Sequence, residues 1–555
     1  MMDAKKLNIA IAQLNPTVGD VDANAAKIAE AYAKAVEAGA DLMVTPELSI
    51  TGCPLEDLVN DPDLLAETLE AAEGLRKLTA GKKTALAIGL PVIGRAYPEN
   101  AVRILQDGKC GYEVRKNYTT AFDPFARRQI DVRTGHQNPP VYLNGQKMGF
   151  LIGDDVLHND LVCELMEEGI KTLIAINADP YKQKDRLKDV LDVYAREKDI
   201  AVVYVNQVGA QDELVFDGGS FIVNPKGQKI KQLGKFKEDF AVANVFQDAA
   251  KAGPTKKADR LCDLWQAAVL ATRDYMRKTG FNDVVLGLSG GVDSAIVAAI
   301  AGDALGAEHV HCLKLPSQFT AEISNTTADQ MAEVWGMPID TVPINTFMTA
   351  YEEELVKTKF GDREANLTEE NLQARIRGNL IMAYTNEYGW LMLNTGNKSE
   401  AATGYSTLYG DTCGAFNPLK DMLKEDIFKL CVWRNENKPE GALGPTGEVI
   451  PKEIITRPPS AELRPLQLDE DRLPPYPVLD GIITEIVQKR TRAADILAKG
   501  YAAKDVLRVY RLIKTFEFKR RQEPPGMVTT DHAFGAGFTL PMVSKFIPKI
   551  LREGK

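Results

Sequence analysis

Short apolar runs alternate with amphipathic segments throughout the first 246 residues. We predict strands at residues 7–13, 42–45, 84–89, 148–152, 172–177, 201–206 and 220–223. Helical segments, such as residues 25–38, lie between these runs. Strands that alternate with helices indicate an α/β domain built from layers of helix and sheet.

A second α/β unit is predicted to begin at Arg260. Its first helix, at residues 261–279, precedes an apolar run at 284–288 that is typical of a buried strand. A helix follows at 295–301, and further strands are expected at 309–315 and 390–393. The segment before Arg260 contains Gly253 and Pro254 and is typical of a linker. The predicted domains are therefore residues 1–246 and 260–555, joined by a linker at 247–259.

Composition narrows the class of protein. A length of 555 residues suggests two to four domains, and 45% hydrophobic with 26% charged residues is ordinary for a soluble globular chain. A net charge of −10 argues against a nucleic-acid partner. No apolar run is long enough for a membrane span, so no membrane partner is expected. The seven cysteines show no CxxC pair, which fits a reducing cytoplasm and argues against a zinc site or a disulfide framework.

The most informative motif lies between the strand at 284–288 and the helix that follows it. It reads Ser289-Gly290-Gly291-Val292-Asp293-Ser294. In a strand–loop–helix turn of this kind, backbone N–H groups converge on a phosphate, and glycines allow close approach. The two serines add hydroxyl donors, and Asp293 could hold Mg²⁺ beside the phosphate. The motif is not a P-loop and resembles the pyrophosphate loop of ATP pyrophosphatases. A glycine-rich turn without a ligand is the alternative interpretation.

Further motifs at residues 369–379, 394–400, 404–411, 418–424, 457–464 and 516–522 accompany this loop. Together they make residues 260–545 resemble NAD synthetase, with another ATP pyrophosphatase, such as an asparagine or GMP synthetase, as the alternative. The resemblance implies a Rossmann-like domain with a parallel sheet. It also implies a reaction in which the carboxylate of deamido-NAD attacks ATP, and ammonia then displaces AMP from the acyl-adenylate to give NAD.

The resemblance also implies a role for individual residues. Asp411, at the ammonia site, Lys424 and Ser460 are the expected catalytic residues. The residues expected to bind ATP are Ser289, Gly290, Gly291, Asp293, Ser294, Thr395, Lys424 and Ser460. Those expected to bind deamido-NAD are Arg375, Lys398 and Lys519. Asp293 and Glu400 are the expected Mg²⁺ ligands, since that ion prefers oxygen donors.

Each of these residues has a simpler structural interpretation. Glu400 could form an ion pair with Lys398, and Arg375 and Arg377 could be surface charges of a helix. Lys424 lies among other charged residues and could belong to a solvated face. Asp411 follows a glycine and could serve only to form a turn.

The first half of the chain resembles the nitrilase-like glutaminase domain that is often fused to NAD synthetases. The resemblance implies an α-β-β-α sandwich with a Glu, Lys, Cys triad. Glu47 matches the general base and Lys116 the oxyanion-stabilising lysine, but Gly153 stands at the position of the cysteine. Because glycine has no side chain to form a thioester, covalent hydrolysis of glutamine is not expected there. The loop at 117–128 also differs from the family pattern.

Gly153 leaves three alternatives to a natural loss of glutaminase activity. The glycine could result from a directed replacement, the alignment could be out of register, or Cys53 or Cys163 could act as a substitute nucleophile. We therefore expect an NAD synthetase that uses ammonia, with ATP, deamido-NAD and Mg²⁺ as its ligands. The rival functions are a glutamine-dependent enzyme and a scaffold that binds deamido-NAD or ATP without turnover. The resemblance also implies a homo-oligomer, a dimer or larger.

Overall fold

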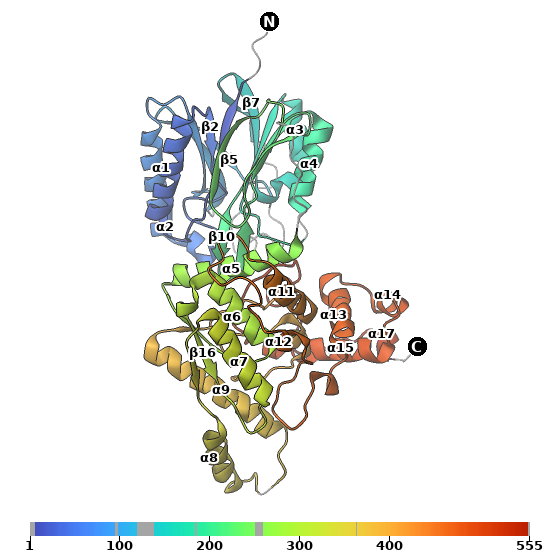
Figure 1. Cartoon of the computed structure of the whole chain (residues 1–555). Coiled ribbons are helices and arrows are strands. Elements are labelled where there is room, and N and C mark those ends of the chain that lie inside the picture. Colours follow the sequence, from blue (N-terminus) through green and yellow to red (C-terminus); the bar gives the residue numbers. More distant parts are fainter. Residues whose placement is uncertain are drawn as a thin grey trace. The chain divides into compact units, whose positions relative to one another are not determined.

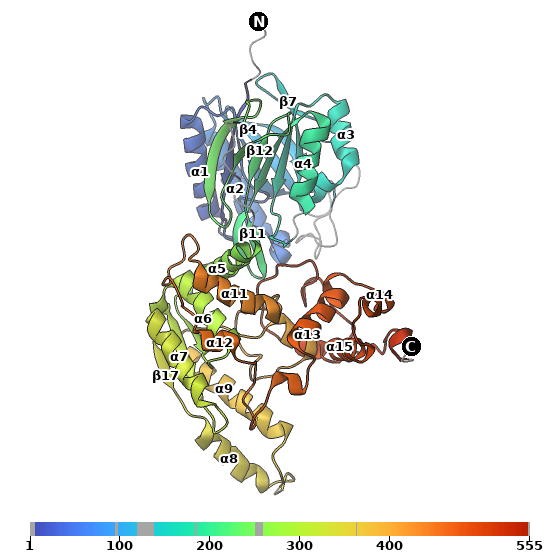
Figure 2. The same ribbon diagram turned by 45° about the vertical axis from the view of Figure 1, so that its right-hand side comes forward.

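The computed structural model describes residues 6–94, 98–118, 138–183, 186–249, 259–361 and 363–552. The chain divides into two compact units, Met1–Ala258 and Asp259–Lys555 (Figures 1 and 2). Most of the predicted linker, at 250–258, and most of the unusual loop, at 119–128, lie outside the described residues.

Two six-stranded sheets form the first unit. One has the order β14-β1-β2-β3-β4-β5, and the other has the order β13-β12-β9-β8-β7-β6. The first sheet contains β1 (Asn8–Gln13), β2 (Leu42–Val44), β3 (Ala85–Val92), β4 (Glu99–Gln106), β5 (Lys109–Arg115) and β14 (Asp239–Asn244). The second contains β6 (Val141–Leu143), β7 (Gln146–Ile152), β8 (Thr172–Asn177), β9 (Ala201–Asn206), β12 (Phe221–Val223) and β13 (Lys229–Gln232). A separate hairpin joins β10 (Val208–Gln211) to β11 (Leu214–Asp217).

The two sheets pack face to face, and a pair of helices covers each outer face (Figure 1). Ile11, Val44, Phe150 and Val203 are buried in the core between the sheets. Helices α1 (Val21–Glu37) and α2 (Pro62–Leu78) share a second core with the first sheet. Helices α3 (Asn159–Glu167) and α4 (Arg186–Lys198) share a third with the second sheet. The predicted α-β-β-α sandwich is confirmed.

Some elements of the first unit differ from their predictions. Helix α1 begins four residues before the predicted position 25, because the Asp20 side chain accepts a hydrogen bond from the Ala23 amide and caps the helix. The prediction did not include β13, whose sequence is Lys-Ile-Lys-Gln. An edge strand with exposed polar side chains carries little apolar signal.

A parallel four-stranded sheet forms the centre of the second unit. Its order is β17-β16-β15-β18, with β15 (Val284–Gly287), β16 (Val310–Lys314), β17 (Ile339–Thr341) and β18 (Leu391–Met392). Helix α6 (Val292–Leu305) is buried along nearly its whole length and packs against α5 (Arg260–Thr279) and α11 (Lys424–Glu436). Helix α9 (Leu367–Tyr388) packs Ile376 and Ile381 against Val285 and Met392. This is the predicted Rossmann-like arrangement with a parallel sheet.

The remaining helices of this unit lie around the sheet and in a C-terminal cluster. They are α7 (Glu322–Trp335), α8 (Asn345–Val356), α10 (Lys398–Thr403), α12 (Lys452–Thr456), α13 (Tyr476–Ile483), α14 (Ala493–Ala498), α15 (Ala503–Thr515), α16 (Glu517–Arg520) and α17 (Lys549–Arg552). A hydrophobic core that includes Leu479, Ile496 and Val509 holds the C-terminal cluster together. Among the helices that the structure describes, none has the length and apolar character needed to cross a membrane.

Candidate active site

A pocket of about 340 Å³ opens at the carboxyl ends of three parallel strands in the second unit. Its wall includes Leu288 after β15, Leu315 after β16 and Asn394 after β18. Ligands of open α/β folds bind at this end of the sheet, where loops from neighbouring strands meet. The pocket has the size of a small-molecule site.

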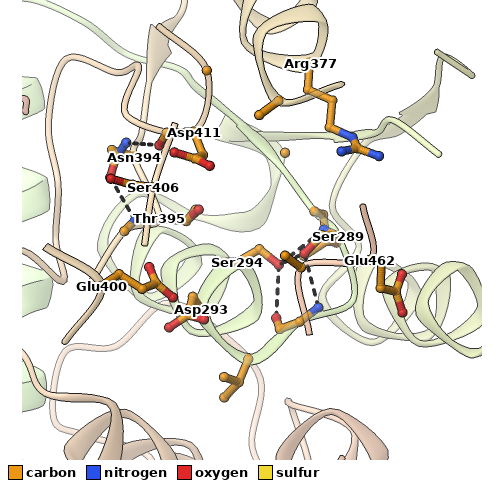
Figure 3. Close-up of a pocket in the computed structure, with 18 of the residues that line it drawn as sticks. Ser289, Asp293, Ser294, Arg377, Asn394, Thr395, Glu400, Ser406, Asp411 and Glu462 are labelled. Carbon is orange, nitrogen blue, oxygen red and sulfur yellow. Dashed lines mark hydrogen bonds between the residues drawn. The ribbon is translucent and has the colours of Figure 1, made fainter. Parts of the chain in front are cut away.

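The Ser/Gly loop forms one wall of the pocket. Ser289 and Ser294 lie side by side, with 3.1 Å between their Oγ atoms, and the Gly291 amide donates to Oγ of Ser289 at 3.3 Å (Figure 3). Gly290 has a φ of +78°, and a Cβ atom there would lie 2.2 Å from the carbonyl oxygen of Ser324. Only glycine fits that position. The loop is thus held in one shape at the N-terminus of α6, where an anion is favoured.

Three charged side chains meet beside this loop. Lys424 donates hydrogen bonds to Oδ2 of Asp293 and, at 3.5 Å, to Oε1 of Glu400. The Asp293 and Glu400 carboxylates lie next to each other (Figure 3). Glu400 also caps α10, because its amide donates to Oδ1 of Asn397 at 3.0 Å and its carboxylate accepts from the Asn397 amide at 3.3 Å. Asn397 in turn donates to Oδ1 of Asp293 at 2.9 Å.

These contacts alter the ionisation of the three groups. Burial and the charge of Asp293 raise the pKa of Glu400 to about 8. Burial by itself would lower the pKa of Lys424, but Asp293 and Glu400 raise it above its ordinary value. Lys424 is only 2% exposed. It is therefore a buried cation at the phosphate end of the pocket, and the solvated-face interpretation does not hold. Glu400 pairs with Lys424 and not with Lys398.

Asp411, Thr395 and Ser460 line other parts of the same pocket. The Asp411 carboxylate accepts a hydrogen bond from the Thr407 amide at 2.6 Å, and Asn394 Nδ2 donates to the Asp411 carbonyl at 2.8 Å (Figure 3). Burial raises the pKa of Asp411 to about 6. Ser460 Oγ donates to the Gln467 carbonyl and accepts from the Glu462 amide, so it shapes the loop that forms the opposite wall.

The pocket also contains charged residues that the sequence prediction did not assign. Arg377 lines it and donates from Nε to the Leu315 carbonyl at 2.9 Å, and burial lowers the pKa of Arg377 to about 10. Glu462 accepts from Ser324 Oγ at 2.8 Å and from Arg457, which fixes the 457–463 loop to α7. Arg377 could have been found from helix periodicity, since it lies three residues after Ala374 and four before Ile381, both buried.

Three cations that we predicted for deamido-NAD do not line this pocket. Arg375 is exposed and donates to the Leu408 carbonyl at 3.2 Å. Lys519 is partly buried and donates to the carbonyls of Gly404, at 2.8 Å, and Ser406. Lys398 is fully buried, and its ammonium group donates to Asp421 and to Oγ1 of Thr530. Of the predicted synthetase residues, these three lie apart from the others.

A second group of polar residues is buried in the first unit, where β2, β5 and β7 end. Lys116 Nζ lies 3.0 Å from Oε1 of Glu47, and each side chain is 3% exposed. Asn100 Nδ2 donates to the same oxygen at 2.6 Å, and the Ala178 amide donates to Oε2 at 2.9 Å. Asp155 accepts from the amides of Asn117 and Tyr118, and its burial raises its pKa to about 7.

Gly153 completes this group at the end of β7, with a φ of +55°. A Cβ atom at Gly153 would lie 2.5 Å from Lys116 Nζ and 3.1 Å from Oε1 of Glu47. The structure thus brings Glu47, Lys116 and Gly153 together, as predicted. The two candidate thiols have other surroundings. Cys53 is buried in the core beneath α1 and α2, and Cys163 on α3 lies 3.9 Å from Lys198 Nζ.

Both units match known families in sequence. The carbon-nitrogen hydrolase family matches residues 8–255, and the NAD synthase family matches residues 264–523. The glutamine-dependent NAD(+) synthetase of Rhodobacter capsulatus is 39% identical over 98% of this chain and 99% of its own length. That of Synechocystis sp. is 37% identical over 98% and 99%.

The fold has a full-length counterpart among solved structures. The glutamine-dependent NAD+ synthetase from Acinetobacter baumannii, solved in complex with ADP, superposes with a TM-score of 0.75 at 34% identity, over 97% of this chain and 99% of that one. Two matched domains in one chain, and relatives that align from end to end, establish the family. This chain belongs to the two-domain glutamine-dependent NAD(+) synthetases, ligases that use ATP to form the amide of NAD.

Proposed function

We propose that this chain amidates deamido-NAD with free ammonia. The observation that carries the proposal is Gly153, which leaves no nucleophilic atom beside Glu47 and Lys116 in the first unit. Covalent hydrolysis of an amide by the nitrilase route needs a thiol at this position. The pocket of the second unit, in contrast, retains its phosphate loop and charged residues. The proposed enzyme therefore keeps the synthetase reaction and has lost its own supply of ammonia.

In the proposed first step, the carboxylate of deamido-NAD attacks the α-phosphorus of ATP. The Ser289–Ser294 loop holds the departing pyrophosphate through its backbone amides and hydroxyls. Lys424 is already charged and buried before ATP binds, so little reorganisation is needed when negative charge develops on the pyrophosphate. Thr395 and Ser460 complete the contacts to ATP from two other walls.

The proposed metal site consists of Asp293 and Glu400. The described residues include no group of three or more His, Cys, Asp or Glu side chains placed to hold a metal by themselves. Two carboxylates beside a phosphate loop nevertheless suit Mg²⁺, which commonly takes one or two carboxylates together with phosphate oxygens and water. When bound, this ion would neutralise charge on the phosphates of ATP.

In the proposed second step, ammonia displaces AMP from the acyl-adenylate, and Asp411 accepts a proton from the nitrogen. Its carboxylate is fixed by the Thr407 amide, and its pKa near 6 leaves it ionised at neutral pH. For deamido-NAD we propose contacts from Arg375 and Lys519. We assign Lys398 a structural role instead, because its ammonium group is enclosed with Asp421.

We also propose a homo-oligomer in a reducing, cytoplasmic compartment. All seven cysteines lie in described parts of the chain, and each is a thiol outside any disulfide. Helix α8 has no buried residue, and it and the segment after it expose large apolar side chains, Phe347, Tyr351, Val356 and Phe360. An exposed apolar surface of this kind commonly marks a protein interface. Light scattering of the native chain and of a Phe347→Ser, Tyr351→Ser variant tests whether a second copy covers it.

The decisive experiment measures NAD formation from deamido-NAD and ATP with either ammonium or glutamine as the only nitrogen source. We expect product with ammonium and none above background with glutamine. An Asp293→Ala variant, measured in parallel, excludes a contaminating synthetase. Equal product with glutamine, in a preparation free of other glutaminases, would overturn the proposal and point to another nucleophile. Binding of deamido-NAD and ATP without product would identify a scaffold.

A further inference from the structure

A second carboxylate lies in the pocket wall with Asp411. Glu523 lines the same pocket, three residues after the end of α16. Among the described residues, no side chain donates a hydrogen bond to its carboxylate. The synthetase motifs used to assign the other site residues end at Gln522 and do not include it.

A continuous set of hydrogen bonds fixes Glu523 relative to Asp411. Asn394 holds the Asp411 carbonyl and accepts from Asn417 Nδ2 at 3.0 Å. The Asn417 backbone pairs with the segment just after Glu523, because its amide donates to the Pro525 carbonyl at 2.9 Å and its carbonyl accepts from the Met527 amide at 3.2 Å. The same polar framework therefore positions both acidic residues.

A bond on the other side connects the two segments directly. The Tyr409 hydroxyl, two residues before Asp411, lies 3.0 Å from Oε1 of Gln522, the residue before Glu523. Glu523 is thus held from both sides, and its place in the pocket wall does not depend on the rotamer of a single exposed side chain.

The charges around Glu523 decide which ligand it can take. Burial raises the pKa of Glu523, and so does the negative charge of Asp411, while Lys420, Arg520 and Lys519 lower it. Burial also raises the pKa of Asp411. A small cation between the two carboxylates would relieve their mutual repulsion and replace lost solvation. The wall that holds both acids is therefore suited to a monovalent cation.

The amidation step requires such a cation and two proton acceptors. Near neutral pH, ammonia in solution is mostly ammonium, and one proton must leave before the nitrogen is nucleophilic. The nitrogen then forms a bond to the acyl carbon, and the bond from that carbon to the phosphate oxygen breaks, with AMP keeping the electron pair. A second proton leaves the nitrogen as the amide forms. Two protons thus depart in each turnover, and one carboxylate cannot hold both.

We propose that Glu523 binds ammonium together with Asp411 and accepts one of the two protons released during amidation. This inference rests on the proposed use of free ammonia. An enzyme that takes its nitrogen from solution gains from a site that concentrates ammonium beside the acyl-adenylate. The ligand class is ammonium or a cation of similar size and hydrogen-bonding capacity.

The test compares the native chain with Glu523→Gln, which keeps the shape of the side chain and removes its charge. We expect the KM for ammonium to rise about tenfold or more, the effect typical of one lost charge-assisted hydrogen bond. The KM values for ATP and deamido-NAD should change by less than about twofold. The defect should shrink as pH is raised through the pKa of ammonium, because neutral ammonia no longer needs a second carboxylate.

The matched control is Glu333→Gln, which removes an exposed charge on α7 outside the pocket and should leave all three KM values unchanged. An unchanged KM for ammonium in Glu523→Gln would overturn the inference. A parallel rise in all three KM values, or a defect that is constant with pH, would show a structural role and also overturn it. Failure of the proposed function is visible separately, in the native chain, as equal use of glutamine. Even then, the ammonium comparison decides the role of Glu523.

Discussion

The Cβ atom that Gly153 lacks would lie 2.5 Å from Nζ of Lys116. A Cβ atom almost never comes this close to another heavy atom, so any side chain at this position must displace the lysine or the backbone. The lysine is held by its ion pair with Glu47, which is almost completely buried. The site is therefore packed around a glycine.

Gly153→Ala should destabilise the first unit by about 2–4 kcal/mol, from the strain of a positive φ and from the displaced lysine. Gly169→Ala is the matched control, because Gly169 has a φ of +82° but nothing within 4 Å of its missing Cβ. It should cost about 1 kcal/mol. Urea unfolding followed by circular dichroism measures both. Equal losses would mean that Lys116 moves aside freely. NAD formation with ammonium should stay within twofold of the native rate in both variants.

Glu47 and Lys116 should act as a structural pair. Lys116→Met leaves a buried carboxylate without its cation and should cost about 3–5 kcal/mol. Adding Glu47→Gln should recover about 1–3 kcal/mol of that loss, because the isolated charge disappears. All four tryptophans, at 265, 335, 390 and 433, lie in the second unit, so their fluorescence reports its unfolding separately. Additive losses in the double variant would contradict a coupled pair.

Local sequence predicted the phosphate loop well, because a strand, a glycine turn and a helix are determined by neighbouring residues. Contacts between distant residues were harder to predict. The Lys424–Asp293 pair spans 131 positions, and the sequence around Lys424 is charged enough to suggest a solvated face. Lys398 shows the opposite error. Its position in a charged motif favoured a ligand contact, but Asp421, 23 residues later, holds it in the core.

The Lys424–Asp293 pair should be essential to the synthetase reaction. Lys424→Met removes the buried cation from the phosphate end of the pocket and should lower kcat by about 10²–10³, the loss typical of one preorganised electrostatic contact. Lys429→Met, on the exposed side of the same helix, is the control and should be neutral. The readout is pyrophosphate release with deamido-NAD and ATP. A normal rate in Lys424→Met would exclude it from the adenylation step.

Arg375 and Arg377 should affect different substrates, although they are two residues apart. Arg377 is buried in the pocket, and Arg377→Ala should raise the KM for ATP about tenfold or more, since a desolvated guanidinium makes strong hydrogen bonds. Arg375 is exposed outside the pocket, so Arg375→Ala should leave the KM for ATP within about twofold and raise that for deamido-NAD. Steady-state kinetics with each substrate varied in turn would show the reverse pattern if this assignment is wrong.

The activity should depend on pH through Asp411. Burial raises its pKa to about 6, and the carboxylate accepts a proton only when it is ionised. At saturating substrates, kcat should therefore fall as pH drops through about 6 and reach a plateau above it. Asp411→Asn keeps the shape of the group but cannot take a proton, so it should lower kcat by about 10²–10⁴ and abolish the acidic limb. A buried carboxylate elsewhere, Asp480, also has its pKa raised to about 6, by burial. An acidic limb that persists in Asp411→Asn would assign it to such a group and remove Asp411 from the proton transfer.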